Sequence, residues 1–342
     1  MAQVLSQIEA LNRDFAHQVL DDHPALEREG FLARRPDSTG IHFCLAQAQV
    51  NGQTIPAIQY VPTTATAWSS DHAIHFDSLG GADAFRPDQF LNVWVGNFGD
   101  LAGYAQMPAL NPATDGIVID YRYFGSGGTA IAPYNDGKTL THLVGNYLGL
   151  YDLWSDVSCQ DDYVSDTPVH NAANYGCPIY RHYSLCHGGS QIEMTINFMD
   201  NTDDACMYMF TYGQLLRMHA VLSERGPRGG LRQGTVVCSD EDLPIVETTI
   251  EQRSNTIAQV PLDVVLYPNP AKGEVQITLQ GASPQMPYRI NIFNALGQLL
   301  ATYQHEGTNP ITLSCDTWGE GIRLVAITTP NQIITKTLII NE

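Results

Sequence analysis

The stretch that decides the fold covers residues 139–156 and reads TLTHLVGNYLGLYDLWSD. Its apolar residues recur at three- and four-residue intervals, which predicts a helix with one buried stripe. That stripe consists of Leu140, Leu143, Val144, Tyr147 and Leu148. His142 and Asn146 lie four residues apart and would share another face of the helix. Gly149 favours the helix end, because glycine readily adopts the left-handed conformation of that turn.

Upstream of this stretch, the pattern predicts one helix followed by sheet strands. Apolar residues of the segment 3–20 recur at helical spacing, so we expect an amphipathic helix there. Four segments are expected as strands, because they alternate or run apolar between turn residues. These segments are 40–49, 57–62, 90–99 and 115–125. The Gly-, Pro- and Asn-rich residues that follow are expected to form the loop into the site helix.

Downstream, the pattern changes twice. Residues 157–190 are long, irregular and rich in cysteine, and such a segment holds together only with disulfides or bound ions. A short helix is expected at 213–222. Residues 246–261 are polar and without clear period, so we predict a linker there between domains 1–245 and 262–342. The second domain consists of short strands between turn residues, which predicts an all-β sandwich.

Composition excludes several classes of function. The 342 residues include 17 basic and 36 acidic ones, for a formal net charge of −19. This balance disfavours nucleic acid and anionic membranes as partners, and it suits hard cations such as calcium. No apolar run approaches the roughly 20 residues of a membrane span, and the N-terminus lacks the pattern of a secretory leader. Four of the seven cysteines cluster in residues 159–206, which points to an oxidising compartment.

The helix carries part of a zinc-peptidase motif. Such an enzyme needs three protein ligands, an open position for water, and a carboxylate beside that water. The pattern His-Glu-x-x-His-x-x-Gly-x-x-His supplies them, because the two helical histidines meet one ion and the Glu faces the water. Here His142 and Gly149 occupy their positions in this pattern. Leu143, Asn146 and Asp152 occupy the positions of the Glu and of the second and third His.

The surrounding sequence resembles the pappalysin/cytophagalysin family of metzincin peptidases. The resemblance covers residues 8–222 and rests on KTLTHLVGNYLGLYDLWSD, DDYVSDTP, NYGCP and INFMDNTDDACMYMFTYGQLLRM. The segments FLNVWVGNFGDLAGYAQMP and DGIVIDYRYFG are also similar to the family. This resemblance implies an α+β, metzincin-like fold with a twisted mixed sheet, a backing helix and an active-site helix, followed here by the all-β domain.

The resemblance implies a metal-related role for four positions. His142 matches the first zinc ligand, and Met199 matches the methionine of the turn beneath the metal. Asn146 stands at the second ligand position, where its amide is a poor zinc donor. Asp152 stands at the third, and a carboxylate oxygen binds zinc well. We therefore expect zinc to bind weakly or not at all.

The two catalytic positions also differ from the family. Leu143 replaces the general-base Glu, whose loss alone removes about 10²–10⁴-fold of rate. Asn201 replaces the Tyr that supports the oxyanion. We therefore predict an inactive metallopeptidase homologue that keeps the cleft and binds a peptide or protein there. Two alternatives remain open, namely a decaying gene copy and a zinc-dependent endopeptidase with an atypical ligand set. The nearest spare imidazoles for such a set are His170, His182 and His187.

The resemblance further implies disulfides and a calcium site. The family's bridges correspond to Cys159–Cys186 and Cys177–Cys206, whereas the residues alone leave three pairings open. Five aspartates lie in residues 152–166 without a basic residue. Asp162 and Thr167 best match the calcium ligands of family members in this region, and the alternative is a solvated acidic loop. The cysteines without an assignment are interpreted as buried free thiols; they are Cys44, Cys238 and Cys315.

The C-terminal part resembles a second family. VVLYPNPAKGEVQITL, INIFNALGQLL and ITKTLIINE, the last with Lys336, resemble the C-terminal sorting domain of type IX secretion substrates in Bacteroidetes. Arg323 is a mild departure from the usual Tyr. The resemblance implies the type IX machinery as a partner, a secreted or cell-surface location, and a signal peptide ahead of Met1 in the native precursor. The alternative is an appended binding sandwich.

Overall fold

The computed structural model describes most of the chain. The described residues are 1–18, 30–50, 53–108, 111–155, 158–178, 180–188, 190–233, 237–238, 263–280, 287–294, 299–307, 309–328 and 333–341. The chain divides into two compact units, Met1–Asp242 and Leu243–Glu342, and each is described by itself. The predicted linker 246–261 lies outside the described residues. Among those residues, no helix is both long and apolar enough to span a membrane.

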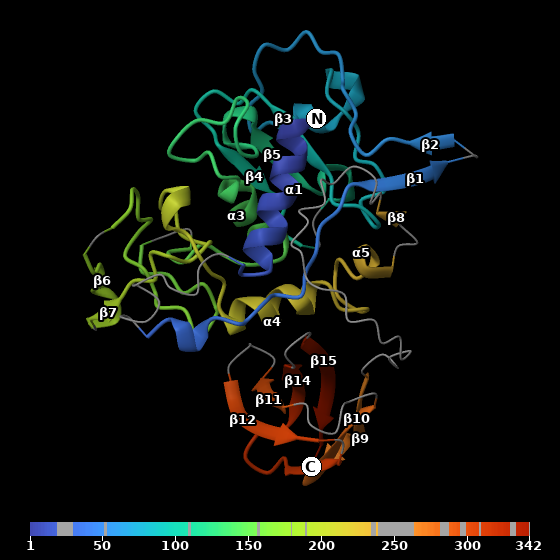
Figure 1. Cartoon of the computed structure of the whole chain (residues 1–342), viewed down its shortest axis with the longest axis vertical. Helices are drawn as coiled ribbons and strands as arrows, with labels where there is room; N and C mark the ends of the chain where they lie inside the picture. The colour runs from blue at the N-terminus through green and yellow to red at the C-terminus, as the bar shows by residue number, and fades with distance from the viewer. Residues whose placement is uncertain are drawn as a thin grey trace, which may run out of the picture. The chain divides into compact units, whose positions relative to one another are not determined.

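The first unit contains a three-stranded mixed sheet in the order β3-β5-β4 (Figure 1). β3 (Val93–Gly96) runs parallel to β5 (Ile117–Asp120), and β4 (Gly103–Ala105) runs antiparallel to it. All four residues of β5 are buried, as expected of a central strand. The predicted strands 90–99 and 115–125 contain β3 and β5. β4 was not predicted, because three residues are too few to show alternation.

Two helices pack side by side in this unit, α1 (Ala2–Phe15) and α3 (Lys138–Tyr147), and α3 also packs against β4 and β5. The predicted site helix is confirmed, and Gly149 follows its end with a left-handed φ of 88°. The carboxylate of Asp204 accepts the N–H groups of Asp136 (2.7 Å) and Lys138 (3.3 Å). A residue distant in sequence thereby caps the first turn of the site helix.

The apolar core of this unit joins the helices to the sheet. It includes Phe15 of α1, Ile117 and Ile119 of β5, and Leu140 and Val144 of α3. A polar contact accompanies it, because the hydroxyl of Thr141 donates to buried Asp14 at 2.7 Å. The site helix is therefore fixed by burial of its apolar stripe on one side and by polar contacts with α1 on another.

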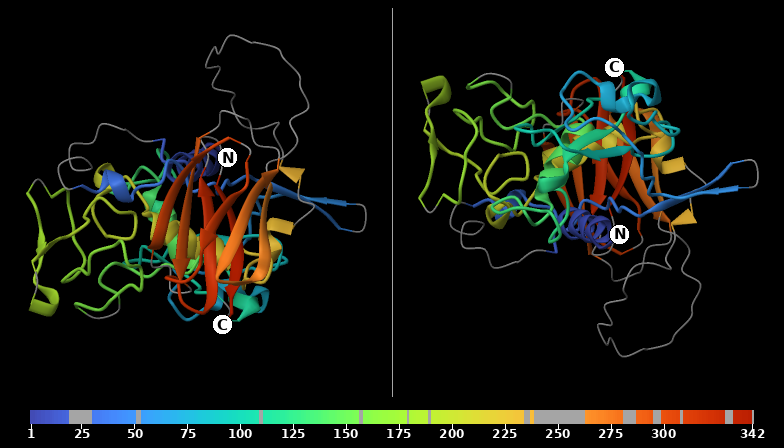
Figure 2. Two further views of the ribbon diagram at one scale, coloured as in Figure 1. Left: turned by 90° about the horizontal axis from the view of Figure 1, so that it is seen from below. Right: turned by 90° about the horizontal axis from the view of Figure 1, so that it is seen from above.

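The other elements of the first unit are short. The remaining helices and strands are α4 (Tyr212–Val221), α5 (Gly230–Gln233), β1 (Ala46–Val50), β2 (Gln53–Ile55), β6 (Tyr183–Ser184), β7 (Gln191–Ile192) and β8 (Val237–Cys238). The 3-10 helices are η1 (Leu32–Arg34), η2 (Ala73–His75), η3 (Asp77–Leu79), η4 (Pro112–Thr114), η5 (Tyr121–Tyr123), η6 (Cys186–Gly188) and η7 (Asp204–Cys206). The β1–β2 hairpin extends away from the rest of the unit (Figure 2). The strand predicted at 57–62 is wrong, because these residues lie on the surface and pair with no described strand.

The second unit is all-β, as predicted. Its strands are β9 (Asp263–Lys272), β10 (Glu274–Gln280), β11 (Pro287–Asn294), β12 (Leu299–Glu306), β13 (Ile311–Ser314), β14 (Gly321–Thr328) and β15 (Ile333–Ile340). They pair in the order β12-β11-β14-β15-β9-β10-β13, with the β15–β9 pair parallel. β10 alternates buried and exposed residues, so its apolar side chains enter a core of their own. β9 contains Pro268 and Pro270, residues that in sequence are more typical of turns than of strands.

Candidate metal centre

The imidazole of His142 is held from both sides. Its Nδ1 lies 2.9 Å from the carbonyl oxygen of Phe198 and 3.2 Å from that of Asp200. Because carbonyl oxygens only accept, Nδ1 donates a proton to them. Its Nε2 lies 3.0 Å from Oδ1 of Asp152. An ionised carboxylate also only accepts, so this geometry favours a ring with a proton on both nitrogens.

The electrostatics agree with this assignment. Burial lowers the pKa of His142, but the charge of Asp152 and the hydrogen bonds to acceptors outweigh burial and leave the pKa above its ordinary 6.5. Burial raises the pKa of the Asp152 carboxyl, but the His142 charge and hydrogen bonds outweigh it and leave this pKa below 3.8. Each side chain therefore stabilises the charged form of the other.

Asn146 completes the cluster. Its Nδ2 donates to Oδ1 of Asp152 at 3.1 Å and to the carbonyl of Leu150 at 3.2 Å. The structure thus brings together the three predicted ligand positions, but as two donors around one carboxylate oxygen. A zinc ion would need the Nε2 lone pair of His142, and that nitrogen is paired with Asp152 here. Within the described part of the chain, no three His, Cys, Asp or Glu side chains are arranged to hold a metal ion. The amide of Asn146 is a poor zinc donor and is used here as a hydrogen-bond donor to Asp152, so the arrangement does not fit the three-ligand zinc site of the motif.

Leu143 makes an apolar contact where the family has its base. Its side chain belongs to the core cluster, and it is 7% exposed. A Cβ added to Gly103 would lie 2.8 Å from Cδ1 of Leu143, so this side chain covers β4 directly. An aliphatic group there has no means to take a proton from water.

The turn at Met199 packs against the site helix. Met199 is fully buried, and a Cβ added to Gly145 of α3 would overlap its sulfur atom. The N–H of Met199 donates to Oδ1 of Asn197 at 2.9 Å. Half-buried Asn201 follows, with its N–H donating to Oδ1 of Asp200 at 2.9 Å. The Met199 turn therefore lies directly against the site helix.

A buried polar network supports this turn, and the sequence analysis missed it. Oδ2 of Asp200 accepts from Nδ2 of Asn174 (2.9 Å), which also donates to Glu193 (2.9 Å). His170 lies beside Asp200, with its Nδ1 3.4 Å from Oδ2. All four residues are buried. No sequence signal could have found them, because their spacing follows no helix or strand period.

Two of the spare imidazoles are engaged in this network. Nε2 of His170 accepts the N–H of Met194 at 2.9 Å, and Nδ1 of His182 lies 2.5 Å from Oδ1 of Asn174. The side chain of His187 lies outside the described residues. His170 therefore uses both ring nitrogens within the protein.

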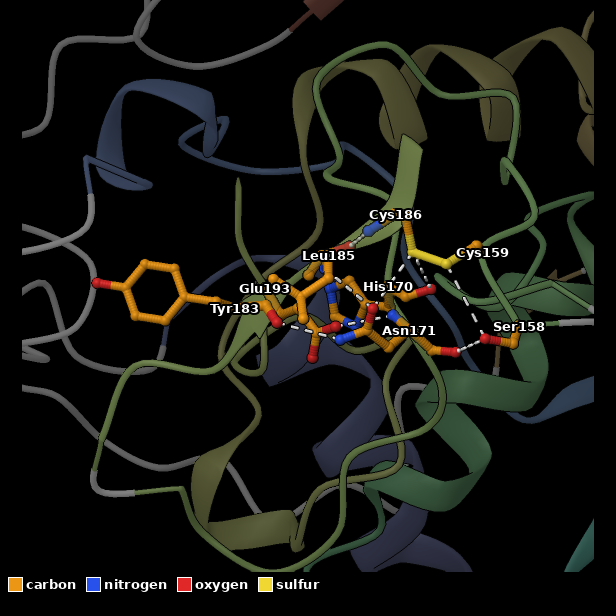
Figure 3. Close-up of a disulfide and its surroundings, with 9 residues drawn as sticks. Ser158, Cys159, His170, Asn171, Tyr183, Leu185, Cys186 and Glu193 are labelled. Atoms are coloured by element: carbon orange, nitrogen blue, oxygen red, sulfur yellow. Dashed lines mark hydrogen bonds between the residues drawn. A yellow bond between two sulfur atoms is a disulfide. The ribbon is translucent and has the colours of Figure 1, made fainter. Parts of the chain in front are cut away.

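Both predicted disulfides form. Cys159–Cys186 has a Cα–Cα distance of 5.3 Å, and Cys177–Cys206 has one of 5.6 Å. Figure 3 shows the first bridge beside Asn171. The side chain of Asn171 bonds the carbonyl of Tyr183 and the N–H of Leu185, both at 3.0 Å. Its own N–H donates to Glu193 at 2.7 Å. This segment is thus tied to the β6–β7 hairpin without regular secondary structure.

The remaining cysteines correct one interpretation. Cys44 is disulfide-bonded, so its interpretation as a free thiol is wrong. Cys315 is a buried free thiol, as expected. The backbone of Cys238 pairs with Ala46 in the β1–β8 ladder, and its side chain lies outside the described residues. The residues around Cys44 gave no sign of its partner, because pairing depends on which distant segments the fold brings together.

The two predicted calcium ligands are neighbours. The hydroxyl of Thr167 lies 2.9 and 2.8 Å from the two carboxylate oxygens of Asp162. Asp162 is buried, which raises the pKa of its carboxyl to about 7 despite the bonds it accepts from Thr167 and the N–H of Val164. A carboxyl in this environment gains from a cation that neutralises it.

Comparison with known proteins agrees with both resemblances. Residues 77–223 match the family described as pregnancy-associated plasma protein-A, and residues 265–341 match the secretion system C-terminal sorting domain. An extracellular metalloprotease of Arthroderma otae is 40% identical over 190 residues, covering 50% of this chain and 68% of the relative. Extracellular metalloprotease 1 of Coccidioides posadasii is 30% identical over 203 residues, covering 57% and 71%.

Solved structures give the same result. Mirolysin in complex with compound 9 is 39% identical, with a TM-score of 0.62 and coverage of 67% of this chain and 88% of that one. Mature mirolysin of Tannerella forsythia in complex with a cleaved peptide is 37% identical, with a TM-score of 0.61 and coverage of 67% and 87%. The first unit therefore has the fold of a metzincin peptidase.

The chain belongs to the pappalysin family of metallopeptidases, and it carries a type IX sorting domain. It is a secreted or cell-surface protein. It spans 58% of an extracellular metalloprotease of Colletotrichum graminicola and 44% of one of Arthroderma benhamiae, about half the length of these relatives.

Proposed function

We propose that this protein is a catalytically inactive pappalysin homologue that binds a peptide or protein beside the site helix. The observation that carries the proposal is the hydrogen bonding of His142. Its Nε2 is paired with Asp152, and Asn146 donates to the same carboxylate oxygen. The position of the general base holds Leu143, which has no titratable group.

The alternative is a zinc endopeptidase with an atypical ligand set. Its ligands would be His142, Asp152 and one further imidazole. His170 offers no free nitrogen for this purpose, because its Nε2 accepts the Met194 N–H and its Nδ1 faces Asp200. Nδ1 of His182 lies within hydrogen-bond distance of Asn174. The contacts of His170 therefore weigh against its use as the third ligand, whereas the contact of His182 engages one of its two ring nitrogens.

Binding of an extended peptide is supported by the position of β4. In the described part of the chain β4 pairs with β5 alone, so its other edge has backbone groups for a further strand. Leu143 lies directly over β4 and offers an apolar contact at the same place. The mirolysin structure with a cleaved peptide shows that a member of this fold holds a peptide.

Metal analysis together with a cleavage assay tests the proposal. The oxidised protein is purified, its zinc content is determined by elemental analysis, and cleavage of denatured protein is followed with and without a chelator. We expect no zinc that is lost with His142→Ala, and no chelator-sensitive cleavage. Stoichiometric zinc with chelator-sensitive cleavage would establish the alternative.

We also propose calcium as a structural ion at Asp162 and Thr167. The support is the buried, unbalanced carboxyl of Asp162 in a segment with little regular structure. Calcium should raise the melting temperature of the wild type but not that of Asp162→Asn. An equal effect of calcium on both proteins would contradict this site.

A further inference from the structure

A second cluster lies on the opposite face of β4 from the site helix. Gly103 and Tyr104 are consecutive in this strand, so their side-chain directions alternate between the two faces. Gly103 lies against Leu143 of α3, whereas Tyr104 packs with a separate apolar cluster that includes Ile74 and Trp94. Beside that cluster lies η2 (Ala73–His75), preceded by His72.

Three rings of this cluster lie close to one another. The ring centroids of His72 and His75 are 5.4 Å apart, those of His72 and Tyr104 are 5.7 Å apart, and those of His75 and Tyr104 are 6.1 Å apart. His75 is 1% exposed and meets Trp94 edge-on at 4.3 Å, whereas His72 is exposed. Packing therefore fixes one imidazole, and the other faces solvent beside it.

The two ring nitrogens of His75 differ in their hydrogen bonding. Nε2 lies 3.2 Å from the hydroxyl of Tyr104. Nδ1 is buried and has no hydrogen-bond partner among the described residues. A buried polar atom without a hydrogen-bond partner costs about 1–3 kcal/mol of folding free energy, so a ligand bound to this nitrogen would be stabilising. Histidines that bind metals commonly have one nitrogen fixed by a neighbouring group and the other directed to the ion.

The backbone of His72 gives a second, independent sign. Its φ of 65° and ψ of 8° are left-handed, which is uncommon for a residue with a side chain. Asp71 accepts the N–H of Ala73 at 3.0 Å and so supports this turn. Such conformations gather at functional sites, where the surrounding structure maintains them. Here the conformation coincides with the approach of the His72 ring to His75.

We propose that His72 and His75 form a binding site for one divalent transition-metal ion, zinc or copper(II), with Nδ1 of His75 as a ligand. Imidazole nitrogen suits both metals. Tyr104 acts as a positioning residue, because its hydroxyl accepts the Nε2 proton and leaves the lone pair on Nδ1. Two protein ligands leave the other positions to water, so the site binds less tightly than a structural zinc site. The proposal uses no residue of the His142 cluster and is independent of the proposed function.

Titration calorimetry of the full, oxidised, chelator-stripped chain with zinc and with copper(II) tests this proposal. We expect one ion to bind the wild type, and His72→Asn to weaken binding at least about tenfold. Asn suits this substitution because it tolerates the left-handed backbone. Tyr104→Phe should weaken binding about 10–100-fold, as the loss of a supporting hydrogen bond does at other metal sites.

Two controls make the outcome specific. His42→Ala removes another exposed histidine, and His142→Ala removes the imidazole of the site helix. Both should bind the ion as the wild type does. Copper(II) bound to the wild type should also show coupling to two imidazole nitrogens in its electron paramagnetic resonance spectrum. No uptake of either metal by the wild type, or unchanged uptake by His72→Asn, would overturn the proposal.

Discussion

Two histidine–aspartate pairs of the first unit differ in their surroundings. His142 and Asp152 lie 3.0 Å apart with side chains 12% and 31% exposed, whereas His170 and Asp200 lie 3.4 Å apart and are fully buried. Nε2 of His170 accepts an N–H and therefore carries no proton. Both nitrogens of His142 face acceptors, which favours the charged form of that ring.

This difference distinguishes the framework, meaning the buried network around His170 and Asp200, from the centre, meaning the cluster of His142, Asn146 and Asp152. The His170–Asp200 pair belongs to a network whose contacts all come from the protein. It therefore stays satisfied whether or not a metal binds nearby. The His142–Asp152 pair occupies the positions that the family resemblance matches to two zinc ligands, and its hydrogen bonding favours the charged form of both side chains.

The largest effect is expected on zinc affinity, in a variant that restores the zinc ligands and the general base of the motif. The triple variant Leu143→Glu, Asn146→His, Asp152→His restores three imidazoles and the base on an unchanged framework. Its zinc affinity should exceed that of the wild type by at least about 10³-fold, because a site with three good ligands replaces one with a single imidazole. Elemental analysis after dialysis measures this, in a His72→Asn background so that the second cluster does not contribute. If the triple variant takes up no zinc, the structure around the ligands has also lost the geometry that zinc binding requires.

The second largest effect is expected on the stability of the first unit, when one of its disulfides is removed. Replacement of both cysteines of Cys177–Cys206 with serine should lower the free energy of unfolding by about 3 kcal/mol, since a loop of 29 residues is released in the unfolded state. Urea unfolding under oxidising conditions measures this. Cys315→Ser is the matched control and should leave the pairing of the other cysteines intact. An equal loss in both variants would mean that the bridge does not stabilise this segment.

A smaller effect is expected at the contact between the two regions. Leu143→Ala should destabilise the first unit by about 2 kcal/mol, because Leu143 belongs to the core and packs against β4. Leu143→Met, which nearly conserves volume, should cost less than about 1 kcal/mol. Chemical unfolding of the two variants provides the comparison. Equal stability of Leu143→Ala and the wild type would show that this side chain is not needed for packing.

The smallest effect concerns the charged pair. The raised pKa of His142 stabilises the fold below pH 6.5, and this contribution declines as the pH rises through the folded value. The lowered pKa of Asp152 stabilises it above pH 3.8, and that contribution is lost as the pH falls. Asp152→Asn should therefore lose most stability between about pH 4 and 6.5, by no more than about 1 kcal/mol. Thermal unfolding from pH 4 to 9 measures this, and a difference that grows above pH 7 would contradict the charged pair.

The elements predicted correctly from the sequence are those indicated by the pattern of neighbouring residues. The site helix, its end at Gly149, β10 and β15 all follow from apolar period and turn residues. The two disulfides and the role of Met199 came from the family resemblance instead. β4 was not predicted, because three residues are too few to show a period. The strand predicted at 57–62 is wrong, because β-branched and aromatic residues also occur in exposed segments outside strands.

By itself, the sequence determined that this chain has a pappalysin scaffold and a sorting domain, and it predicted that four functional positions differ from the family. These conclusions follow from the identity and order of residues. The tertiary structure decided how the altered positions satisfy one another, which imidazoles are occupied, and that His72 approaches His75 behind β4. The physical reason is that hydrogen bonds and charge states depend on contacts between residues far apart in the chain, and no local pattern records those contacts.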